Sequence, residues 1–431
     1  MTVDCTGGSG AGTPVAGLQA AVLCGGLGTR LRPLTDTVPK PMVDVNGVPF
    51  LEHLLRQLVS QGVGRIVLMT GYLGDQIRAH FGSGQDHRCD IVYSHGSETW
   101  STGRRLLEAG VLLDSRFLLL YADNFALVDL RQVLELHLRE EPSITLTLSP
   151  KAHGNIAVPG DGRVPRYQPD RSDDGLDHVE IGYMVVERDR VLAALGQIGG
   201  APDVDYSEVI KVMVSSGEVA GFVIGGGYHS ISDPERLELT RDYLNPKKIL
   251  LVDRDGVINE QSPRGEYVDR WDKFRFVEDT VTALEALSRS GFRFVVITNQ
   301  AGVARGLVDK QELDLIHRNM VQTLARRGVE VVAVYVSPHH WNENSIMRKP
   351  EPGMFFQASG DLRFRLDRVL YIGDDIRDCQ AAANAGCGMV FLGEVGPGET
   401  MPDTRHPQHS FNSLAEAVPF IIDHYESERL R

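Results

Sequence analysis

Apolar residues recur along the chain in two alternating patterns, which predict helices and strands in turn. Apolar positions fall at helical spacing in FLEHLLRQLVSQGV, which begins at Phe50. The run that follows, RIVLMTG from Arg65, is short and ends in glycine, as is typical of a buried strand. A further strand is predicted for FLLLYADN from Phe117, which ends in acidic and polar residues. Strands that alternate with helices form mostly parallel sheets, whose ligands lie at the carboxyl ends of the strands.

The alternation repeats after Lys247, so we predict a second domain of the same architecture. A helix is predicted for TVTALEALSRSG, and strands are predicted for KKILLVDRDGVIN, FRFVVITNQ, VEVVAVYVS and RVLYIGDD. A short junction is marked by DYLNPKK, around Asn245 and Pro246. We expect an α/β fold of two Rossmann-like three-layer α/β/α domains, at residues 18–245 and 246–431, after a disordered tail at residues 1–17.

Composition restricts the compartment and the partners. The 431 residues carry a net charge of −14, which argues against nucleic acid or an anionic membrane as a partner. The five cysteines are scattered without paired spacing, which favours a reducing compartment. The first 17 residues are rich in Gly, Ser and Thr and lack the basic start and apolar core of a signal peptide. We therefore expect a cytoplasmic protein that binds neither nucleic acid nor membrane.

A glycine-rich segment, CGGLGTRLRPLTDTVPKPM, follows the first predicted strand and carries candidate phosphate chemistry. Gly25, Gly26 and Gly28 allow the backbone to approach a ligand and direct N–H groups at phosphates. Arg30 and Lys40 would add positive charge, and the prolines on either side of Lys40 hold it in an extended conformation. A tight structural turn remains the alternative explanation for the glycines.

Gly-Gly-x-Gly-Thr-Arg together with Pro-Lys-Pro resembles the signature of sugar-1-phosphate nucleotidylyltransferases, over about residues 18–240. The resemblance implies that a sugar-phosphate oxygen attacks the α-phosphate of a nucleoside triphosphate and that pyrophosphate leaves. Positioning and charge neutralisation would provide most of the catalysis. Arg30 would stabilise the phosphates and the leaving group, and Lys40 would hold the phosphate of the sugar. The nucleotide-binding loop would comprise Gly25, Gly26, Gly28 and Thr29.

The same resemblance implies a metal ligand and a sugar contact further along the chain. Asp123, at the end of LLLYADN, matches the acid that holds Mg²⁺, although a helix N-cap would also explain it. Glu180, in EIGYMVV, lies where the family places sugar contacts and would accept a hydrogen bond from a hydroxyl.

Two departures from the family pattern concern the metal and the sugar-binding loop. The family's second metal-binding Asp is replaced by Ser230 in YHSISDPERL, and Asp233 lies three residues further on. The family's Leu-Gly-Thr-Gly-Gly loop is replaced by WSTGRRL, from Trp100 to Leu106. Either Asp123 holds the metal with help from Asp233 or substrate oxygens, or turnover is slow or lost.

Paired carboxylates in the second half predict phosphoryl chemistry. Asp253 and Asp255 are two residues apart at a strand end, so both can face one site. Such a pair suits a nucleophile and a general acid/base, with Mg²⁺ offsetting their repulsion. An N-cap and a solvated neighbour are the alternative, but three further elements argue against it. These are Thr298 and Asn299 in VVITNQAGVARG, Lys349 in MRKPEPG, and Asp374, Asp375 and Asp378 in LYIGDDIRD.

Four such elements in this order resemble the haloacid dehalogenase phosphatases. The resemblance implies that Asp253 attacks phosphorus to form an aspartyl-phosphate and that Asp255 protonates the leaving group and then activates water. Thr298 and Lys349 would hold the phosphoryl oxygens. Magnesium would be bound by Asp253, the backbone carbonyl of Asp255, and Asp374.

Finer detail comes from the segments around these elements. Asp375 or Asp378 would orient Lys349, while Asn299, Arg305 and Arg348 would complete the catalytic and substrate-binding set. The segments DGVIN…GEYVDRWDKFRF, TNQAGVARG and RKPEPGM look like the branch that contains heptose-1,7-bisphosphate and histidinol-phosphate phosphatases.

The two resemblances together imply consecutive steps of one pathway. The phosphatase would remove the 7-phosphate of a heptose 1,7-bisphosphate, and the transferase would couple the heptose 1-phosphate to a nucleotide, with GTP favoured. Histidinol phosphate is the competing substrate, but it gives no reason for a fused sugar transferase. The N-terminal domain could instead sense a nucleotide or sugar and regulate the phosphatase. A homodimer is implied by family resemblance only.

The loop SPHHWNENSIMRKPEPGM raises the question of a second metal. In the resembling phosphatases this loop holds structural zinc through three cysteines and one histidine, at positions that here are Ser337, His339, Ser345 and Met347. Zinc needs about four thiolate or imidazole ligands, and His340 beside His339 does not replace the missing ones. We expect no structural zinc, a loop fixed by prolines and Trp341, and delivery of Lys349 to the phosphate site.

Overall fold

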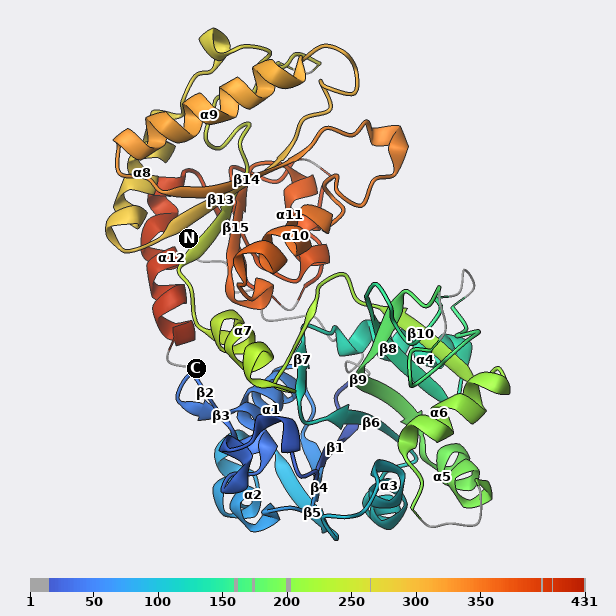
Figure 1. Ribbon diagram of the computed structural model, residues 1–431. Coiled ribbons are helices and arrows are strands. Elements are labelled where there is room, and N and C mark those ends of the chain that lie inside the picture. Colours follow the sequence, from blue (N-terminus) through green and yellow to red (C-terminus); the bar gives the residue numbers. More distant parts are fainter. Residues whose placement is uncertain are drawn as a thin grey trace. The chain divides into compact units, whose positions relative to one another are not determined.

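The protein was analysed as a computed structural model, which describes residues 15–158, 162–172, 175–198, 203–263, 265–396, 398–404 and 406–429. Internal contacts divide the chain into two compact units, Met1–Asp242 and Tyr243–Arg431. Residues 1–14 of the predicted tail lie outside the described residues, whereas Val15 is buried in a turn. Within the described ranges, none of the helices is long and apolar enough to cross a membrane. The predicted α/β class is confirmed, and each unit is built around its own sheet (Figure 1).

The N-terminal unit contains a seven-stranded sheet with the order β10-β8-β9-β6-β1-β4-β5. Its strands are β1 (Gln19–Cys24), β4 (Arg65–Thr70), β5 (Asp90–His95), β6 (Arg116–Tyr121), β8 (Ile144–Pro150), β9 (His178–Glu187) and β10 (Val219–Val223). Only β9 runs antiparallel to its neighbours in this sheet. All six residues of β1 are buried, as a central strand covered on both faces requires. Two small ribbons pair β2 (Asp44–Val45) with β3 (Val48–Pro49), and β7 (Asn124–Ala126) with β11 (Tyr228–Ser230).

Helices of the N-terminal unit bury one face each. In α1, the leucines at positions 51, 54, 55 and 58 are fully buried beside Phe50, as the helical spacing predicted. The helices of this unit are α1 (Phe50–Ser60), α2 (Gly74–Phe81), α3 (Thr102–Ala109), α4 (Leu130–Glu140), α5 (Arg188–Gln197), α6 (Tyr206–Ser215) and α7 (Pro234–Leu244).

The C-terminal unit contains a six-stranded, all-parallel sheet with the order β14-β13-β12-β15-β16-β17. Its strands are β12 (Ile249–Val252), β13 (Arg293–Asn299), β14 (Val331–Ser337), β15 (Leu370–Gly373), β16 (Gly388–Leu392) and β17 (Gln408–Phe411). Its helices are α8 (Glu278–Arg289), α9 (Lys310–Arg326), α10 (Gly353–Leu362), α11 (Ile376–Ala385) and α12 (Leu414–Arg429). Since β13, β12 and β15 are adjacent and parallel, their carboxyl ends meet at one edge of the sheet.

Candidate active sites

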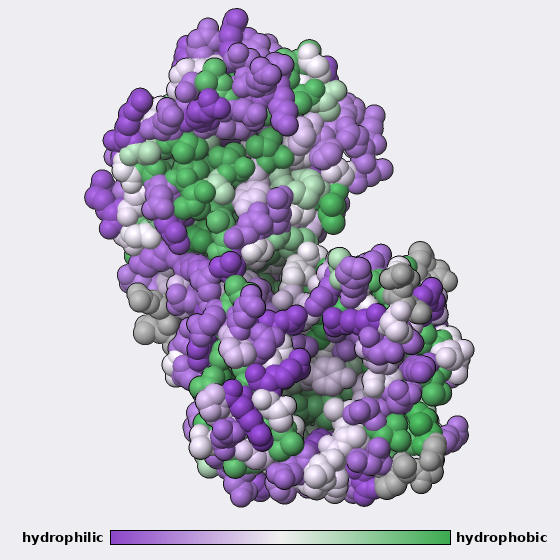
Figure 2. All heavy atoms as spheres, viewed as in Figure 1, coloured by the Kyte–Doolittle hydropathy of each residue, from purple (hydrophilic) through white to green (hydrophobic). Residues whose placement is uncertain are grey.

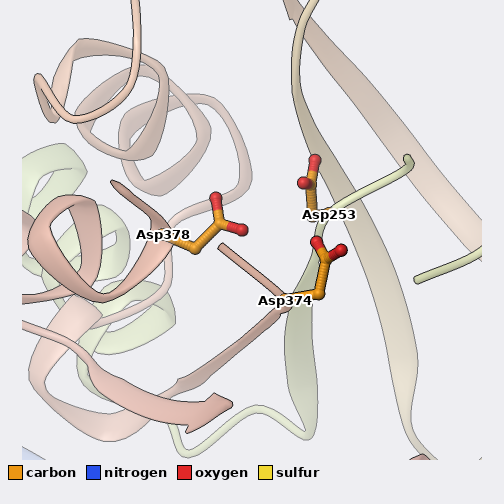
Figure 3. Close-up of side chains that lie close together, drawn as sticks. All are labelled: Asp253, Asp374 and Asp378. Atoms are coloured by element: carbon orange, nitrogen blue, oxygen red, sulfur yellow. The ribbon is translucent and has the colours of Figure 1, made fainter. Parts of the chain in front are cut away.

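Three acidic side chains converge at the carboxyl edge of the C-terminal sheet. Asp253 directly follows β12, Asp374 directly follows β15, and Asp378 lies in the first turn of α11. One oxygen from each carboxylate lies within 4.8 Å of the other two. Figure 3 shows Asp253 and Asp374 side by side at the strand ends, with Asp378 reaching toward them from its helix. The strand order therefore brings Asp253 together with Asp374 and Asp378, which lie more than one hundred positions further along the sequence.

Lys349 enters this cluster as a buried cation. Its ammonium lies 2.8 Å from Oδ1 of Asp253 and 2.8 Å from Oδ1 of Asp378, and it donates to the Tyr371 hydroxyl at 2.7 Å. The side chain is only 4% exposed. Burial alone would lower the pKa of Lys349, but the two carboxylates outweigh burial and raise it. Lys349 is therefore charged, next to the predicted nucleophile, where it can hold a phosphoryl oxygen.

Asn299 fixes the backbone of Lys349. Its side-chain amide donates to the carbonyl of Lys349 at 3.0 Å, and its side-chain oxygen accepts from the N–H of Lys349 at 3.0 Å. These two hydrogen bonds attach the loop to the end of β13, so the lysine approaches Asp253 from a fixed position. Thr298, the neighbouring residue of β13, is buried, and its hydroxyl accepts from Gln300 at 2.8 Å.

The acidic cluster has the properties of a cation site. Burial, with the neighbouring charges of Asp378 and Asp375, raises the pKa of Asp374 to about 7. Oδ1 of Asp374 is buried and has no hydrogen-bond partner among the described residues. A Cβ on Gly256 would stand 1.9 Å from the Asp374 carboxylate, so this position requires glycine. Carboxylate oxygens are preferred ligands of Mg²⁺, and the residues present fit such an ion.

Asp255 does not join this cluster; it is held by Arg254. Two guanidinium hydrogen bonds, at 2.8 and 2.9 Å, bind its two oxygens, and Gln300 donates a further one at 2.7 Å. Burial would raise the pKa of Asp255, but Arg254 outweighs burial and lowers it. Asp255 is thus ionised here, which is the form that activates water. Donation of a proton requires its side chain to leave Arg254 first.

Arg254 is a functional candidate that we did not predict from the sequence. Its side chain is 1% exposed, and besides Asp255 it contacts Nε2 of His317 on α9 at 2.9 Å. Burial and the adjacent guanidinium lower the pKa of His317 to about 3, so the imidazole is neutral and accepts the hydrogen bond. Its position between Asp253 and Asp255 was the feature of the sequence that could have indicated its role.

The other predicted phosphatase residues lie around the cluster. Asp375 caps α11 and pairs with Arg377 at 2.7 Å, so of the two candidate partners of Lys349 it is Asp378 that contacts the ammonium. The guanidinium of Arg305 lies over the rings of Tyr267 and Trp341. Arg348 donates to the carbonyl of His339 at 3.2 Å.

The predicted zinc loop is organised by hydrogen bonds and ring packing. Nδ1 of His339 lies 2.8 Å from Glu343, and His340 caps the turn that begins at Trp341. The rings of His340 and Trp341 pack at 3.8 Å between centroids. Of the four positions that correspond to zinc ligands in the resembling family, Ser337 is fully buried at the end of β14.

A pocket of about 350 Å³ lies at the carboxyl ends of β1 and β6 in the N-terminal unit. Figure 2 shows a hollow in the face of this unit that is turned to the viewer, with hydrophilic side chains around it. The structure brings together here seven of the predicted residues, namely Gly25, Gly26, Gly28, Thr29, Arg30, Lys40 and Asp123. The alternative that Asp123 caps a helix is wrong, because β7 follows it directly.

Two other predicted residues of this unit lie apart from the pocket lining. Glu180 is not among the described residues that line the pocket; burial, with the charge of Asp123, raises its pKa to about 7. Asp233 caps α7, since it accepts a hydrogen bond from the N–H of Arg236 at 2.9 Å. Arg105, which we did not predict, is buried and donates to the carbonyls of Gly25, Thr70 and Ser97. The departure of the WSTGRRL segment from the family pattern was the feature of the sequence that could have drawn attention to Arg105.

Comparison with known proteins divides the chain in the same way. The Nucleotidyl transferase family model matches residues 19–166, and the Polynucleotide kinase 3 phosphatase model matches residues 248–385. D-glycero-beta-D-manno-heptose-1,7-bisphosphate 7-phosphatase of Yersinia pestis is 33% identical over 184 residues, which cover 41% of this chain and 96% of that protein. Mannose-1-phosphate guanylyltransferase of Mycobacterium tuberculosis is 30% identical over 226 residues, which cover 51% of this chain and 62% of that protein.

A solved structure also matches the C-terminal unit. It is the D,D-heptose 1.7-bisphosphate phosphatase from B. bronchiseptica complexed with magnesium and phosphate, with 31% identity and a TM-score of 0.37. The match covers 41% of this chain and 98% of that one.

Proposed function

Through its C-terminal part the chain belongs to the family of the D-glycero-beta-D-manno-heptose-1,7-bisphosphate 7-phosphatases. We therefore propose that this part removes the 7-phosphate of a heptose 1,7-bisphosphate. A nucleotidyl transferase domain precedes it. The observation that carries the proposal is the buried Lys349 ammonium, held between Asp253 and Asp378, two of the three carboxylates of the acidic cluster. A phosphatase needs such an arrangement, because nucleophile and phosphate are both anionic.

The proposed reaction begins when a carboxylate oxygen of Asp253 attacks phosphorus. The bond to the sugar oxygen breaks, Asp255 supplies its proton, and an aspartyl-phosphate remains. Lys349 and Thr298 hold phosphoryl oxygens throughout. Asp255, ionised again, takes a proton from water, which attacks phosphorus and releases phosphate. Magnesium held by Asp253, Asp374 and the backbone carbonyl of Asp255 would neutralise charge on the phosphate.

Phosphate release by an Asp253→Asn variant tests the nucleophile. The amide is a far weaker nucleophile, so we expect release from heptose 1,7-bisphosphate to fall at least about 10³-fold. Asp314→Asn, on the exposed face of α9, provides a matched control that keeps full activity. Release by Asp253→Asn within about tenfold of the control would refute this role. Histidinol phosphate, tested in parallel, should be the poorer substrate.

For the N-terminal unit we propose nucleotidyl transfer, with GTP as the favoured donor, to the heptose 1-phosphate that the phosphatase produces. The support is the pocket, which is lined by glycines at 25, 26 and 28 and by the cationic side chains of Arg30 and Lys40. Pyrophosphate release with GTP, ATP, CTP or UTP and heptose 1-phosphate tests this. Lys40→Ala should abolish release, whereas Lys211→Ala, exposed on α6, should not. Equal release by the native protein and Lys40→Ala would refute it.

A second candidate for the N-terminal unit is regulation of the phosphatase by a bound nucleotide or sugar. Ser230 favours it, because a hydroxyl stands where the resembling transferases have a metal-binding carboxylate, and because Asp233 is engaged in capping α7. Under this alternative, GTP would change the rate of phosphate release without any pyrophosphate release. The transferase proposal predicts pyrophosphate release and no effect of GTP on the rate of phosphate release.

A further inference from the structure

Asp123, the expected metal ligand of the N-terminal unit, is already paired with a cation. Oδ2 of Asp123 lies 2.5 Å from the ammonium of Lys40, and both residues line the pocket. The lysine side chain is only 14% exposed, so the surrounding residues hold the ammonium in place. The charge of this carboxylate is therefore neutralised by the protein itself.

The second expected metal position also carries positive charge. Ser230 lies next to Asp123, because β11 pairs with β7 and the N–H of Ile231 donates to the carbonyl of Asp123 at 3.0 Å. The Ser230 hydroxyl accepts from the guanidinium of Arg236 at 3.3 Å and is 3.1 Å from the Ser232 hydroxyl. The same guanidinium forms an ion pair with Asp233 at 3.4 Å. A carboxylate and a bound ion are thus replaced here by a hydroxyl and a guanidinium.

The remaining groups of the pocket are also mainly cationic or already hydrogen-bonded. Arg30 and Arg105 also line it; Arg105 donates hydrogen bonds to three backbone carbonyls, and the negative charge of Asp203 acts on its guanidinium. The other lining carboxylate, Asp205, accepts a hydrogen bond from Thr102 at 3.2 Å. In the part of the chain that the structure describes, groups of three converging His, Cys, Asp or Glu residues occur only in the C-terminal unit. The donor set does not fit an Mg²⁺ ion bridged by protein carboxylates.

We propose that the N-terminal unit binds the phosphates of its ligand directly through Lys40, Arg30 and Arg236, in place of a magnesium ion held by two protein carboxylates. The inference rests on the proposed function in so far as the ligand is a nucleoside triphosphate. Phosphate oxygens would compete with Asp123 for the ammonium of Lys40. Arg236 would bind them at the edge of the pocket, where Ser232 lines it next to Ser230. A divalent ion would then accompany the nucleotide and would not be required for its binding.

Binding of GTP to the whole protein, with EDTA or with Mg²⁺, tests this inference. Trp100 lines the pocket, so quenching of its fluorescence reports binding there, and Trp100→Phe identifies the signal. We expect the dissociation constants with EDTA and with Mg²⁺ to agree within about tenfold. In EDTA, Lys40→Ala and Arg236→Ala should each weaken binding at least about tenfold, since each removes a charge-assisted contact. Lys211→Ala serves as the matched control.

Ser230→Asp provides the converse test. A carboxylate beside Asp123 would repel phosphate in EDTA and would create the missing ligand pair, so binding should become dependent on Mg²⁺ by more than about tenfold. If Ser230→Asp does not fold, the Arg236→Ala result decides alone. Native protein that loses more than about tenfold in affinity in EDTA overturns the inference and leaves the transferase proposal standing. Absence of quenching by GTP, ATP, CTP and UTP in both conditions refutes the transferase proposal itself.

Discussion

Replacing Asp374 by asparagine tests whether the acidic cluster reduces stability in the absence of metal. Asp374→Asn keeps the shape of the side chain and removes its charge. The carboxyl has a usual pKa of 3.8, and burial, with Asp378 and Asp375, raises it to about 7 in the folded protein. Its buried Oδ1 has no hydrogen-bond partner among the described residues, so burial outweighs the opposing effects of the Lys349 charge and a backbone hydrogen bond.

The sign of the effect follows from proton linkage. Between about pH 4 and pH 7 the unfolded chain has lost this proton while the folded protein retains it. The free energy of unfolding of the native protein therefore falls as the pH rises through this window. The contribution of this carboxyl to that fall is absent in Asp374→Asn. The difference between 3.8 and about 7 is equivalent to about 4 kcal/mol. We expect about half of it, about 2 kcal/mol, because the partly exposed carboxyl is screened by water.

Urea unfolding in EDTA at pH 5 and pH 8 measures this. In a Trp100→Phe background the remaining tryptophans, Trp271 and Trp341, both lie in the C-terminal unit and report its unfolding. Because pH 5 already lies above 3.8, the interval from pH 5 to pH 8 contains about two thirds of this loss, and the native protein should lose about 1.3 kcal/mol more than Asp374→Asn. Added Mg²⁺ should restore stability at pH 8 only when Asp374 is present. An identical pH dependence of both proteins would refute the reasoning, and Asp314→Asn should behave like the native protein.

Three further substitutions follow from individual contacts. Asn299→Ala removes both hydrogen bonds to the Lys349 backbone, so kcat should fall about tenfold with little change in KM; an unchanged kcat in steady-state assays would contradict this. Arg254→Ala leaves Asp255 half-buried without its cation and should cost about 3 kcal/mol in urea unfolding; a loss below about 1 kcal/mol would show that Arg254 is dispensable. Arg105→Ala removes the guanidinium donor from three carbonyls, each of which keeps one backbone N–H donor, and should destabilise the N-terminal unit by about 2 kcal/mol, measured by calorimetry; an unchanged transition would contradict this.

The sequence alone was sufficient to place Asp253 and Asp374 at one edge of the sheet, where their carboxylates converge. Each follows or ends an apolar run, and parallel strands in this class present their carboxyl ends at one edge. The same logic could not decide between Asp375 and Asp378 as the partner of Lys349. These residues lie three positions apart at a helix start, and the cap geometry places one at the N-cap and the other inside the first turn. That geometry depends on where α11 begins, which the sequence does not fix to one residue.

Arg254 and Arg105 were not predicted for a different reason. Each is a buried cation with partners that include groups from distant segments, such as His317 on α9 and the carbonyls of Gly25 and Thr70. The spacing of apolar residues indicates which positions of a sequence are buried. Charged residues are seldom buried unless they are paired, so the same spacing does not identify a buried arginine. Only the folded chain shows that a partner is available.

The central claim is that the two units perform consecutive reactions on one sugar, and product analysis by mass spectrometry tests it most directly. The whole protein is given heptose 1,7-bisphosphate, Mg²⁺ and GTP. We predict a nucleotide-linked heptose that carries no 7-phosphate, together with pyrophosphate. Asp253→Asn should form none of this product from the bisphosphate but should form it from heptose 1-phosphate. Phosphate release without any nucleotide-linked sugar from either substrate, or with any of the four nucleoside triphosphates, would contradict the claim.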